Sequence, residues 1–157
     1  MEAQNGRVAH VMTREVIYMY PNDTVADAYE CMQEYNFRHI PIVDGECKLV
    51  GVVSDRDILR ILSPNPQDPI PDIGLDEIMS DEPIACLKNS AISSVCATMV
   101  QNKIDCLPVI DRKTELLGLV TTSDLLELLS QHESPYATIM SPFLYNLRAY
   151  SKISDPL

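Results

Sequence analysis

The stretch "GVVSDRDILRILS" at residues 51–63 decides the organisation of this chain, because "GLVTTSDLLELLS" at residues 118–130 repeats its pattern. The offset between the two stretches is 67 residues, and the same register continues upstream without a gap. At several positions the register pairs identical residues, the first being Met12 with Met79 and the last Asp57 with Asp124. An ungapped self-match of this length indicates an internal duplication.

Each repeat predicts the same order of elements. A short apolar helical turn, ending at Met12 or Met79, is followed by a strand and then by a helix with one apolar face. Two short strands joined by a turn-prone segment predict a hairpin, and a last helix follows. The expected elements are a strand (16–19 and 84–87), a helix (25–32 and 92–99), a hairpin (39–54 and 106–121) and a last helix (55–62 and 122–129). Each repeat is therefore β-α-β-β-α, and the fold class is α/β (α+β).

The domain organisation follows from the duplication. Repeat one covers residues 8–63 and repeat two covers residues 75–130. The segment 64–74 between them is rich in proline, which removes amide donors and favours extended backbone, so it predicts a linker. A unit as small as one repeat buries too little surface to be stable alone. We therefore predict that the two repeats share one core as a single pseudo-twofold module.

The last segment, residues 131–157, is predicted to be a tail with a short helix. Its "YATIMS" at 136–141 resembles the opening turns of the repeats, and Phe143, Leu147 and Tyr150 stand at helical spacing. Two roles stay open for this helix: covering the module's own surface, or docking on a second copy.

The charge and residue usage exclude several classes of function. Twelve basic and twenty-three acidic residues give a net charge of −11, which repels nucleic acid and anionic lipid. No apolar run approaches the ~18 residues of a membrane span, and the N-terminus has no signal-peptide core. The five cysteines are odd in number and show no C-x-x-C spacing, which is typical of reduced structural thiols. We predict a cytoplasmic protein that binds neither nucleic acid nor membrane.

No catalytic or metal-binding motif is present in the sequence. It has no G-x-x-x-x-G-K-S/T loop, no G-x-G-x-x-G and no G-x-S-x-G elbow. The three histidines stand at no ligand spacing, so no metal site is predicted. A nucleophile at Cys106 or Cys31 helped by His39 has no activating partner in the sequence. We therefore predict that the protein is not an enzyme and requires no cofactor.

Two polar pairs at the hairpin-to-helix junctions, Ser54 with Asp57 and Thr121 with Asp124, allow two interpretations. Both pairs match the S/T-x-x-D/E capping box, which stabilises a helix start. The same helix start also offers free amide donors and a positive dipole end for a phosphate. The hydroxyl would donate to that phosphate, and the aspartate would accept from ribose hydroxyls. We favour ligand binding over capping alone.

These features together resemble a tandem CBS (cystathionine beta-synthase) domain pair, also called a Bateman module. The resemblance covers residues 8 to about 130 and rests on the paired repeats, on "FRHIPIVD" at 37–44, and on "GVVSDRD" and "GLVTTSD". It implies that the hydroxyl and aspartate of each motif contact the phosphate and ribose of an adenine nucleotide. It also implies a base slot formed by the first strand and the proline-containing strand of the repeats. The residues implied for that slot are Ile17, Ile40, Pro41, Ile84, Leu107 and Pro108.

The two prolines have an alternative interpretation, since proline in a short strand is commonly an edge or strand-start feature. The cationic residues differ between the repeats. Arg38, His39 and Arg56 correspond to Asp105, Cys106 and Ser123. Arginine suits bidentate phosphate binding, so we predict two unequal sites. The site at Ser54 and Asp57 would take the more highly phosphorylated ligand, unless the arginines are ordinary surface charges.

The sequence therefore predicts a regulatory CBS-pair protein that binds an adenine nucleotide in clefts between the repeats. The expected ligand is AMP, ADP, ATP or another adenosine compound. Binding would be signalled through conformation or oligomer state to an unidentified regulated protein, and the family resemblance implies a homodimer. The alternative is a dimerisation scaffold that binds no ligand.

Overall fold

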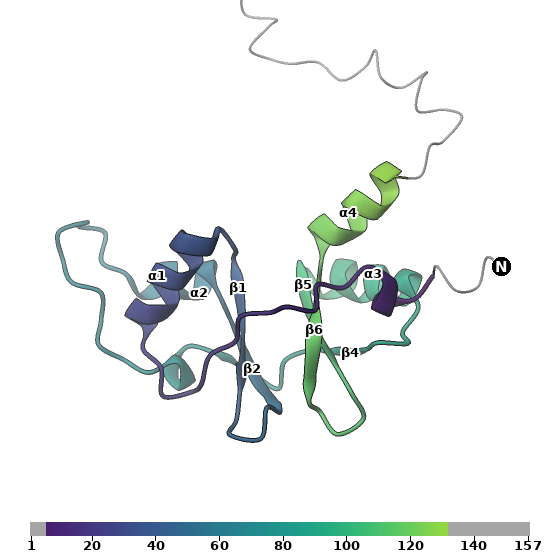
Figure 1. The fold of residues 1–157 in the computed structure, drawn as a ribbon. Coiled ribbons are helices and arrows are strands. Elements are labelled where there is room, and N and C mark those ends of the chain that lie inside the picture. The colour runs from purple at the N-terminus through teal and green to yellow at the C-terminus, as the bar shows by residue number, and fades with distance from the viewer. Residues whose placement is uncertain (1–5, 132–157) are drawn as a thin grey trace, which may run out of the picture. The chain divides into compact units, whose positions relative to one another are not determined.

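The computed structural model describes residues 6–131, which contain both repeats (Figure 1). The patterns in residues 132–157, including Phe143, lie outside this range. The first repeat contains η1 (Val8–His10), α1 (Val25–Tyr35), β1 (His39–Val43), β2 (Leu49–Ser54) and α2 (Asp55–Ile61). The second contains η2 (Leu75–Glu77), β3 (Ser80–Asp81), β4 (Cys86–Leu87), α3 (Ile92–Asn102), β5 (Cys106–Ile110), β6 (Leu116–Thr121) and α4 (Thr122–Gln131).

The predicted mixed α/β class is confirmed, with helices and two three-stranded sheets, β1-β2-β3 and β4-β5-β6. The described residues up to Leu125 form one compact unit. Within the described residues, none of the helices has the length and apolar character needed to cross a membrane.

The predicted first strand of repeat one is wrong over most of its length. Only Met19 pairs, as a single parallel bridge to Ile42 in β1. A turn follows at once, since Asp23 N–H donates to the Tyr20 carbonyl (3.0 Å), and it carries the chain away from the sheet. In repeat two the corresponding strand is β4, which is also shorter than expected and runs parallel to β5.

Helix α1 begins with a capping box at Thr24. Thr24 Oγ1 accepts from Asp27 N–H (3.1 Å), and Asp27 Oδ2 accepts from Thr24 N–H (3.3 Å). This is a complete capping box, which supplies acceptors to amides at the helix start. The helix ends at Asn36, whose φ of 55° lies in the left-handed region that asparagine tolerates.

The opening segment of each repeat pairs with the last strand of the other repeat. Ser80 in β3, at the start of repeat two, pairs with Val52 in β2. In the equivalent pairing, Thr13 bridges Leu119 in β6 through two backbone hydrogen bonds of 2.8 and 2.9 Å. Figure 1 shows the N-terminal purple segment reaching α3, where Val8 N–H donates to the Ser90 carbonyl (3.0 Å).

The hydrophobic interior also combines residues of both repeats. The sequence predicted one shared core, whereas the described residues contain two buried clusters. The first cluster holds Val25, Ala28, Met32, Ile40, Ile42, Val53 and Ile58 of repeat one, together with Leu75 of repeat two. The second holds Val95, Met99, Leu107, Val109, Val120 and Leu125 of repeat two, together with Val8 and Met12 of repeat one. The repeats are joined because each cluster is completed by the other repeat.

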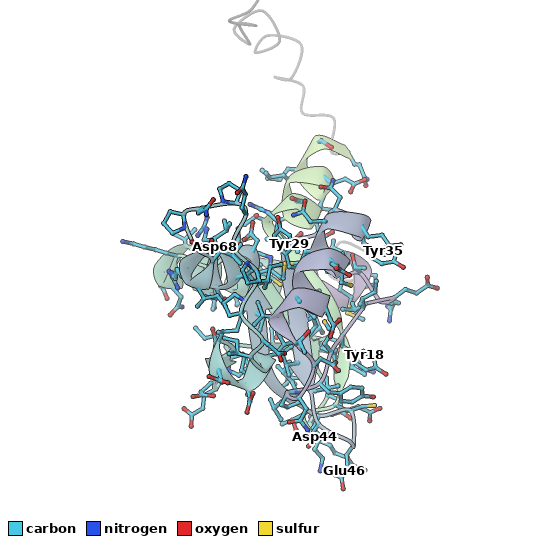
Figure 2. The ribbon with its side chains drawn as sticks, turned by 90° about the vertical axis from the view of Figure 1, so that its left-hand side faces the viewer. Tyr18, Tyr29, Tyr35, Asp44, Glu46 and Asp68 are labelled. Carbon is cyan, nitrogen blue, oxygen red and sulfur yellow. The ribbon has the colours of Figure 1, made fainter. Side chains whose placement is uncertain are left out.

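The two hairpin tips also pair with each other. Leu49 N–H donates to the Thr114 carbonyl (2.9 Å), and Leu116 N–H donates to the Cys47 carbonyl (3.1 Å). The two bonds are related by the repeat offset, as a pseudo-twofold arrangement requires. Asp44, labelled with Glu46 in Figure 2, starts the first tip, and its Oδ1 accepts from Glu46 and Lys48 N–H (2.9 and 3.0 Å). These backbone donors lower the pKa of Asp44.

Candidate functional site

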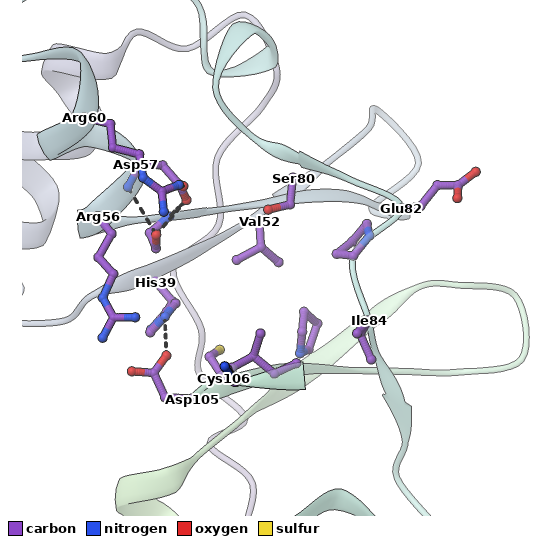
Figure 3. Close-up of a pocket in the computed structure, with 15 residues that line it drawn as sticks. His39, Val52, Arg56, Asp57, Arg60, Ser80, Glu82, Ile84, Asp105 and Cys106 are labelled. Carbon is purple, nitrogen blue, oxygen red and sulfur yellow. Dashed lines mark hydrogen bonds and ion pairs between the residues drawn. The ribbon is translucent and has the colours of Figure 1, made fainter. Parts of the chain in front are cut away.

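A cavity of about 350 Å³, here called the Ser54 pocket, is built from both repeats (Figure 3). Its lining from repeat one is His39, Val52, Ser54, Arg56, Asp57 and Arg60. Its lining from repeat two is Ser80, Glu82, Pro83, Ile84, Lys103, Ile104, Asp105, Cys106 and Pro108. The β2–β3 pairing explains this mixture, because it places the chain from Ser80 onward beside the strand that ends at Ser54.

A second cavity, of about 270 Å³ and here called the Thr121 pocket, is the equivalent of the first under the repeat offset. It is lined by Thr13, Glu15, Val16, Ile17, Tyr35, Phe37, His39, Leu119, Thr121 and Asp124. Every lining residue except Tyr35 has its counterpart in the Ser54 pocket. The molecule therefore carries two related cavities, each combining the polar motif of one repeat with the opening segment of the other.

Both polar motifs form capping boxes, so the capping interpretation is confirmed. Ser54 N–H and Oγ–H donate to Asp57 Oδ2 (2.9 and 2.6 Å), and Asp57 N–H donates to Ser54 Oγ (3.3 Å). Thr121 and Asp124 make the same three bonds, at 2.7, 2.8 and 3.3 Å. All carboxylate bonds of the box use Oδ2. The second oxygen, Oδ1, takes no part in capping: in Asp57 it accepts from Arg60, and a ligand hydroxyl would share or replace that bond.

The expectation of free amide donors at these helix starts is wrong for two positions in each repeat. Asp55 N–H donates to the Arg38 carbonyl (2.9 Å) and Asp57 N–H to Ser54 Oγ. In repeat two, Thr122 N–H donates to the Asp105 carbonyl (3.0 Å). Because the fold has already satisfied these amides, a phosphate in either pocket would find fewer backbone donors than a helix start commonly offers.

Cationic side chains line the Ser54 pocket. They are Arg56, Arg60 and Lys103. Arg60 donates to Asp57 Oδ1 (3.2 Å) from an exposed position. Arg56 and Lys103 are exposed and make no ion pair within residues 6–131. Of the two arginines that the sequence singled out, the structure brings Arg56 to Ser54 and Asp57, whereas Arg38 does not line this cavity.

His39 lines both pockets. Its Nε2 lies 2.9 Å from Asp105 Oδ1 (Figure 3). Arg38 lies 3.4 Å from the other oxygen of Asp105, so both side chains of repeat one pair with this carboxylate of repeat two. The His39 side chain is 16% exposed. Burial lowers the pKa of His39, the Arg38 charge lowers it further, and the Asp105 and Asp55 charges oppose the shift. A neutral His39 still donates to Asp105 when its proton is on Nε2.

The direction of the His39 pKa shift can be tested. We expect an NMR titration of its imidazole to give a value below the ordinary 6.5. Asp105→Asn should lower that pKa further, and Arg38→Ala should raise it. Since the unfolded chain then binds more protons, the contribution of His39 to stability is present above pH 6.5 and decreases as pH falls through the folded pKa. A wild-type pKa above 6.5 would contradict this account.

The apolar residues implied for a base slot are divided by the alternation of side chains along a strand. Ile17 lines the Thr121 pocket, while Ile84 and Pro108 line the Ser54 pocket. Ile40 and Leu107 instead belong to the two buried clusters. Pro41 is buried in β1 and lines neither cavity.

The pockets also contain residues that the sequence reasoning missed. Glu15 and Glu82 occupy equivalent places, as do Phe37 and Ile104. The repeat offset was a signal that could have paired them. It could not have shown that they face the motif of the other repeat.

Cys106 lies in the Ser54 pocket, but it is a poor nucleophile. Burial raises its pKa to about 12, and burial raises that of Cys86 to about 11. Both thiols are therefore protonated near neutral pH. All five cysteines are free. Within residues 6–131, no group of three or more His, Cys, Asp or Glu side chains has a geometry that could hold a metal ion.

The family model for the CBS domain matches twice, at residues 8–64 and 75–131. The chain belongs to the CBS-domain family. Among solved structures, it is similar to the CBS domain pair of protein MJ0100 in complex with 5′-methylthioadenosine and S-adenosyl-L-methionine. That match has a TM-score of 0.71 and 27% identity, and covers 79% of this chain and 95% of the other.

Curated relatives include enzymes and an uncharacterised protein. The chain is 27% identical over 117 residues to inosine-5′-monophosphate dehydrogenase of Methanocaldococcus jannaschii, covering 74% of this chain and 22% of that enzyme. It is 25% identical over 119 residues to an uncharacterised 17.7 kDa protein of Acidianus ambivalens, covering 76% and 70%. The chain thus spans about a quarter of the length of the first relatives, 22% and 24%. The match to each of these two enzymes covers less than a quarter of the enzyme.

Proposed function

We propose that this CBS pair is a regulatory module that binds an adenine nucleotide, AMP, ADP or ATP, in the Ser54 pocket. The observation that carries the proposal is that one cavity combines a ribose acceptor, an apolar wall and three cationic side chains. The CBS pair of MJ0100, at 27% identity, was solved with two adenosine compounds, which supports an adenosine ligand here.

Each part of the nucleotide has a partner in this pocket. Asp57 Oδ1 accepts from the ribose hydroxyls while Oδ2 keeps the helix capped. Ile84, Ile104 and Pro108 offer apolar surface to the base. Arg56 and Lys103 bind the phosphates, and Arg60 joins them by exchanging Asp57 for a phosphate oxygen. Ser54 donates to phosphate only by giving up its bond to Asp57.

The regulatory signal follows from the position of the pocket. The ligand touches Asp57 of repeat one and Ile84 of repeat two, so its affinity depends on how the repeats are held together. A ligand shifts such an equilibrium toward the arrangement that it binds more tightly. We propose that this shift is transmitted to a second copy or to a regulated protein.

Titration calorimetry of AMP, ADP and ATP into wild type and Asp57→Ala tests the proposal. The variant loses a charge-assisted hydrogen bond to ribose, so we expect a ten- to a hundredfold loss of affinity, about 1.5–3 kcal/mol. Asp27→Ala is the matched control, because it removes the same kind of capping box from α1 and lines neither pocket. Both variants should lose ~1 kcal/mol of stability, and only Asp57→Ala should lose affinity.

Two results would contradict the proposal. Equal loss of affinity in Asp27→Ala and Asp57→Ala would mean that the aspartate acts only through the helix cap. Failure of the folded wild type to bind any adenine nucleotide would favour the alternative, a CBS scaffold that binds no ligand.

A further inference from the structure

The Thr121 pocket repeats the groups that hold adenosine in the Ser54 pocket but has no counterpart, among the described residues, of its three cationic side chains. We propose that it binds an adenosine compound whose 5′ substituent is uncharged or cationic, and that it rejects 5′ phosphates. This inference rests on the proposed function, namely that the two equivalent cavities are adenosine sites.

The groups for ribose and base are present. Asp124 keeps its Oδ1 outside the capping box, as Asp57 does. Ile17 and Phe37 take the places of Ile84 and Ile104. Tyr35 adds a second ring, stacked on Phe37 with centroids 6.1 Å apart and an interplanar angle of 17°. Tyr35 has no counterpart in the lining of the Ser54 pocket, and its ring offers an aromatic surface to an adenine.

The cationic groups for phosphate are what this lining lacks. Among residues 6–131, no lysine or arginine lines the Thr121 pocket, whereas Arg56, Arg60 and Lys103 line its equivalent. The repeat offset replaces Arg56 by Ser123 and Lys103 by Asn36. The carboxylates in this lining are Glu15 and Asp124. Its imidazole is His39, whose lowered pKa favours the neutral form.

The charge balance therefore differs between the pockets. A 5′ phosphate in the Thr121 pocket would lie with the Glu15 and Asp124 carboxylates and without a compensating cation in the lining. Like charges in a partly enclosed site repel, and such repulsion discriminates between ligands of the same shape. A thioether removes this repulsion, and a sulfonium reverses it.

Two arginines neighbour residues of this lining in the sequence: Arg14, which donates to the Ala9 carbonyl (2.8 Å), and Arg38, which must be included in the test. Arg38 precedes His39 and is the counterpart of Asp105 under the repeat offset. In the structure it is paired with Asp105 (3.4 Å) and lines a separate cavity with Asp55. The proposal requires that Arg38 stays with Asp105 when ligand binds.

The experiment uses Asp57→Ala, in which the Ser54 pocket is weakened, and titrates 5′-methylthioadenosine, S-adenosylmethionine and AMP by calorimetry. We expect one site for each of the first two compounds and at least tenfold weaker binding of AMP. Adding Asp124→Ala should remove that site. Adding Ser123→Arg supplies the guanidinium that Arg56 supplies in the other repeat, and should raise AMP affinity roughly tenfold. Ser123→Gln, long but uncharged, is the matched control and should not.

The outcomes separate this inference from the proposed function. AMP binding to Asp57→Ala as tightly as 5′-methylthioadenosine overturns the inference, and loss of that binding in Arg38→Ala would identify Arg38 as the phosphate ligand. If the wild type binds AMP but Asp57→Ala binds none of the three compounds, the inference fails and the proposed function stands. If the wild type binds no adenosine compound, the proposed function fails first.

Discussion

Leu75→Ala is expected to destabilise repeat one, although Leu75 opens repeat two in the sequence. Its side chain is fully buried, at 0% exposure, in the cluster of α1, β1 and β2. Replacing such a leucine by alanine removes its transfer free energy and leaves a cavity, which costs about 2–5 kcal/mol. Val8 is the counterpart of Leu75: it opens repeat one and packs in the cluster of β5 and β6 of repeat two. Val8→Ala is expected to cost about 2 kcal/mol there.

Chemical denaturation measures the size of these effects, and native-state hydrogen exchange measures their location. Leu75→Ala should accelerate amide exchange in β1 and β2 more than in β5 and β6, and Val8→Ala should show the reverse. Leu59→Ala is the control, because Leu59 is 62% exposed and its loss should change stability by less than about 0.5 kcal/mol. If amide exchange in Leu75→Ala were faster in β5 and β6 than in β1 and β2, Leu75 would not pack on repeat one.

Gly118→Ala should be strongly destabilising, whereas the equivalent Gly51→Ala should be mild. A Cβ at Gly118 would lie 2.5 Å from the Thr13 carbonyl oxygen, which is backbone. Relief requires moving Thr13 away from Leu119 and weakening their two hydrogen bonds, so we expect a cost of about 3 kcal/mol. A Cβ at Gly51 would meet Met79 Sδ at 2.6 Å, and a methionine side chain can change rotamer.

Thermal and urea unfolding of the two glycine variants, side by side, checks this difference. The outcome expected is a loss of about 1 kcal/mol or less for Gly51→Ala. Equal losses in the two variants would mean that the Thr13–Leu119 bridge does not hold the N-terminal segment on repeat two. Neither glycine has positive φ, so the difference cannot come from left-handed backbone.

Much of the fold was predictable because its signals are local. The capping pair Thr24 and Asp27, the turn at Asp44 and the apolar spacing of α1 each depend on residues within a few positions of one another. The predicted strand at 16–19 failed because it has only one paired residue, Met19. Its composition does not show that the chain turns away at Tyr20.

The candidate site was predicted less completely than the fold. The structure brings Arg56 and Ile84 to Ser54 and Asp57, but it places Ile40 in a core cluster and Arg38 on another cavity. Side chains alternate along a strand, and that of Ile40 in β1 belongs to the first buried cluster. The position of Arg38 is decided by Asp105, which is far away in sequence.

The sequence by itself determined the duplication, the order of elements and the two capping pairs. Only the tertiary structure decided that η1 packs on repeat two and η2 on repeat one. The physical reason is that the two repeats have the same apolar pattern, so the residues around Met12 or Met79 do not indicate which of the two sheets they pack on. Whether an opening segment packs on its own repeat or on the other repeat depends on linker geometry and on long-range burial, which no short stretch of sequence encodes. That choice also placed Ile84 beside Asp57 and Ile17 beside Asp124, and so made each pocket a joint product of both repeats.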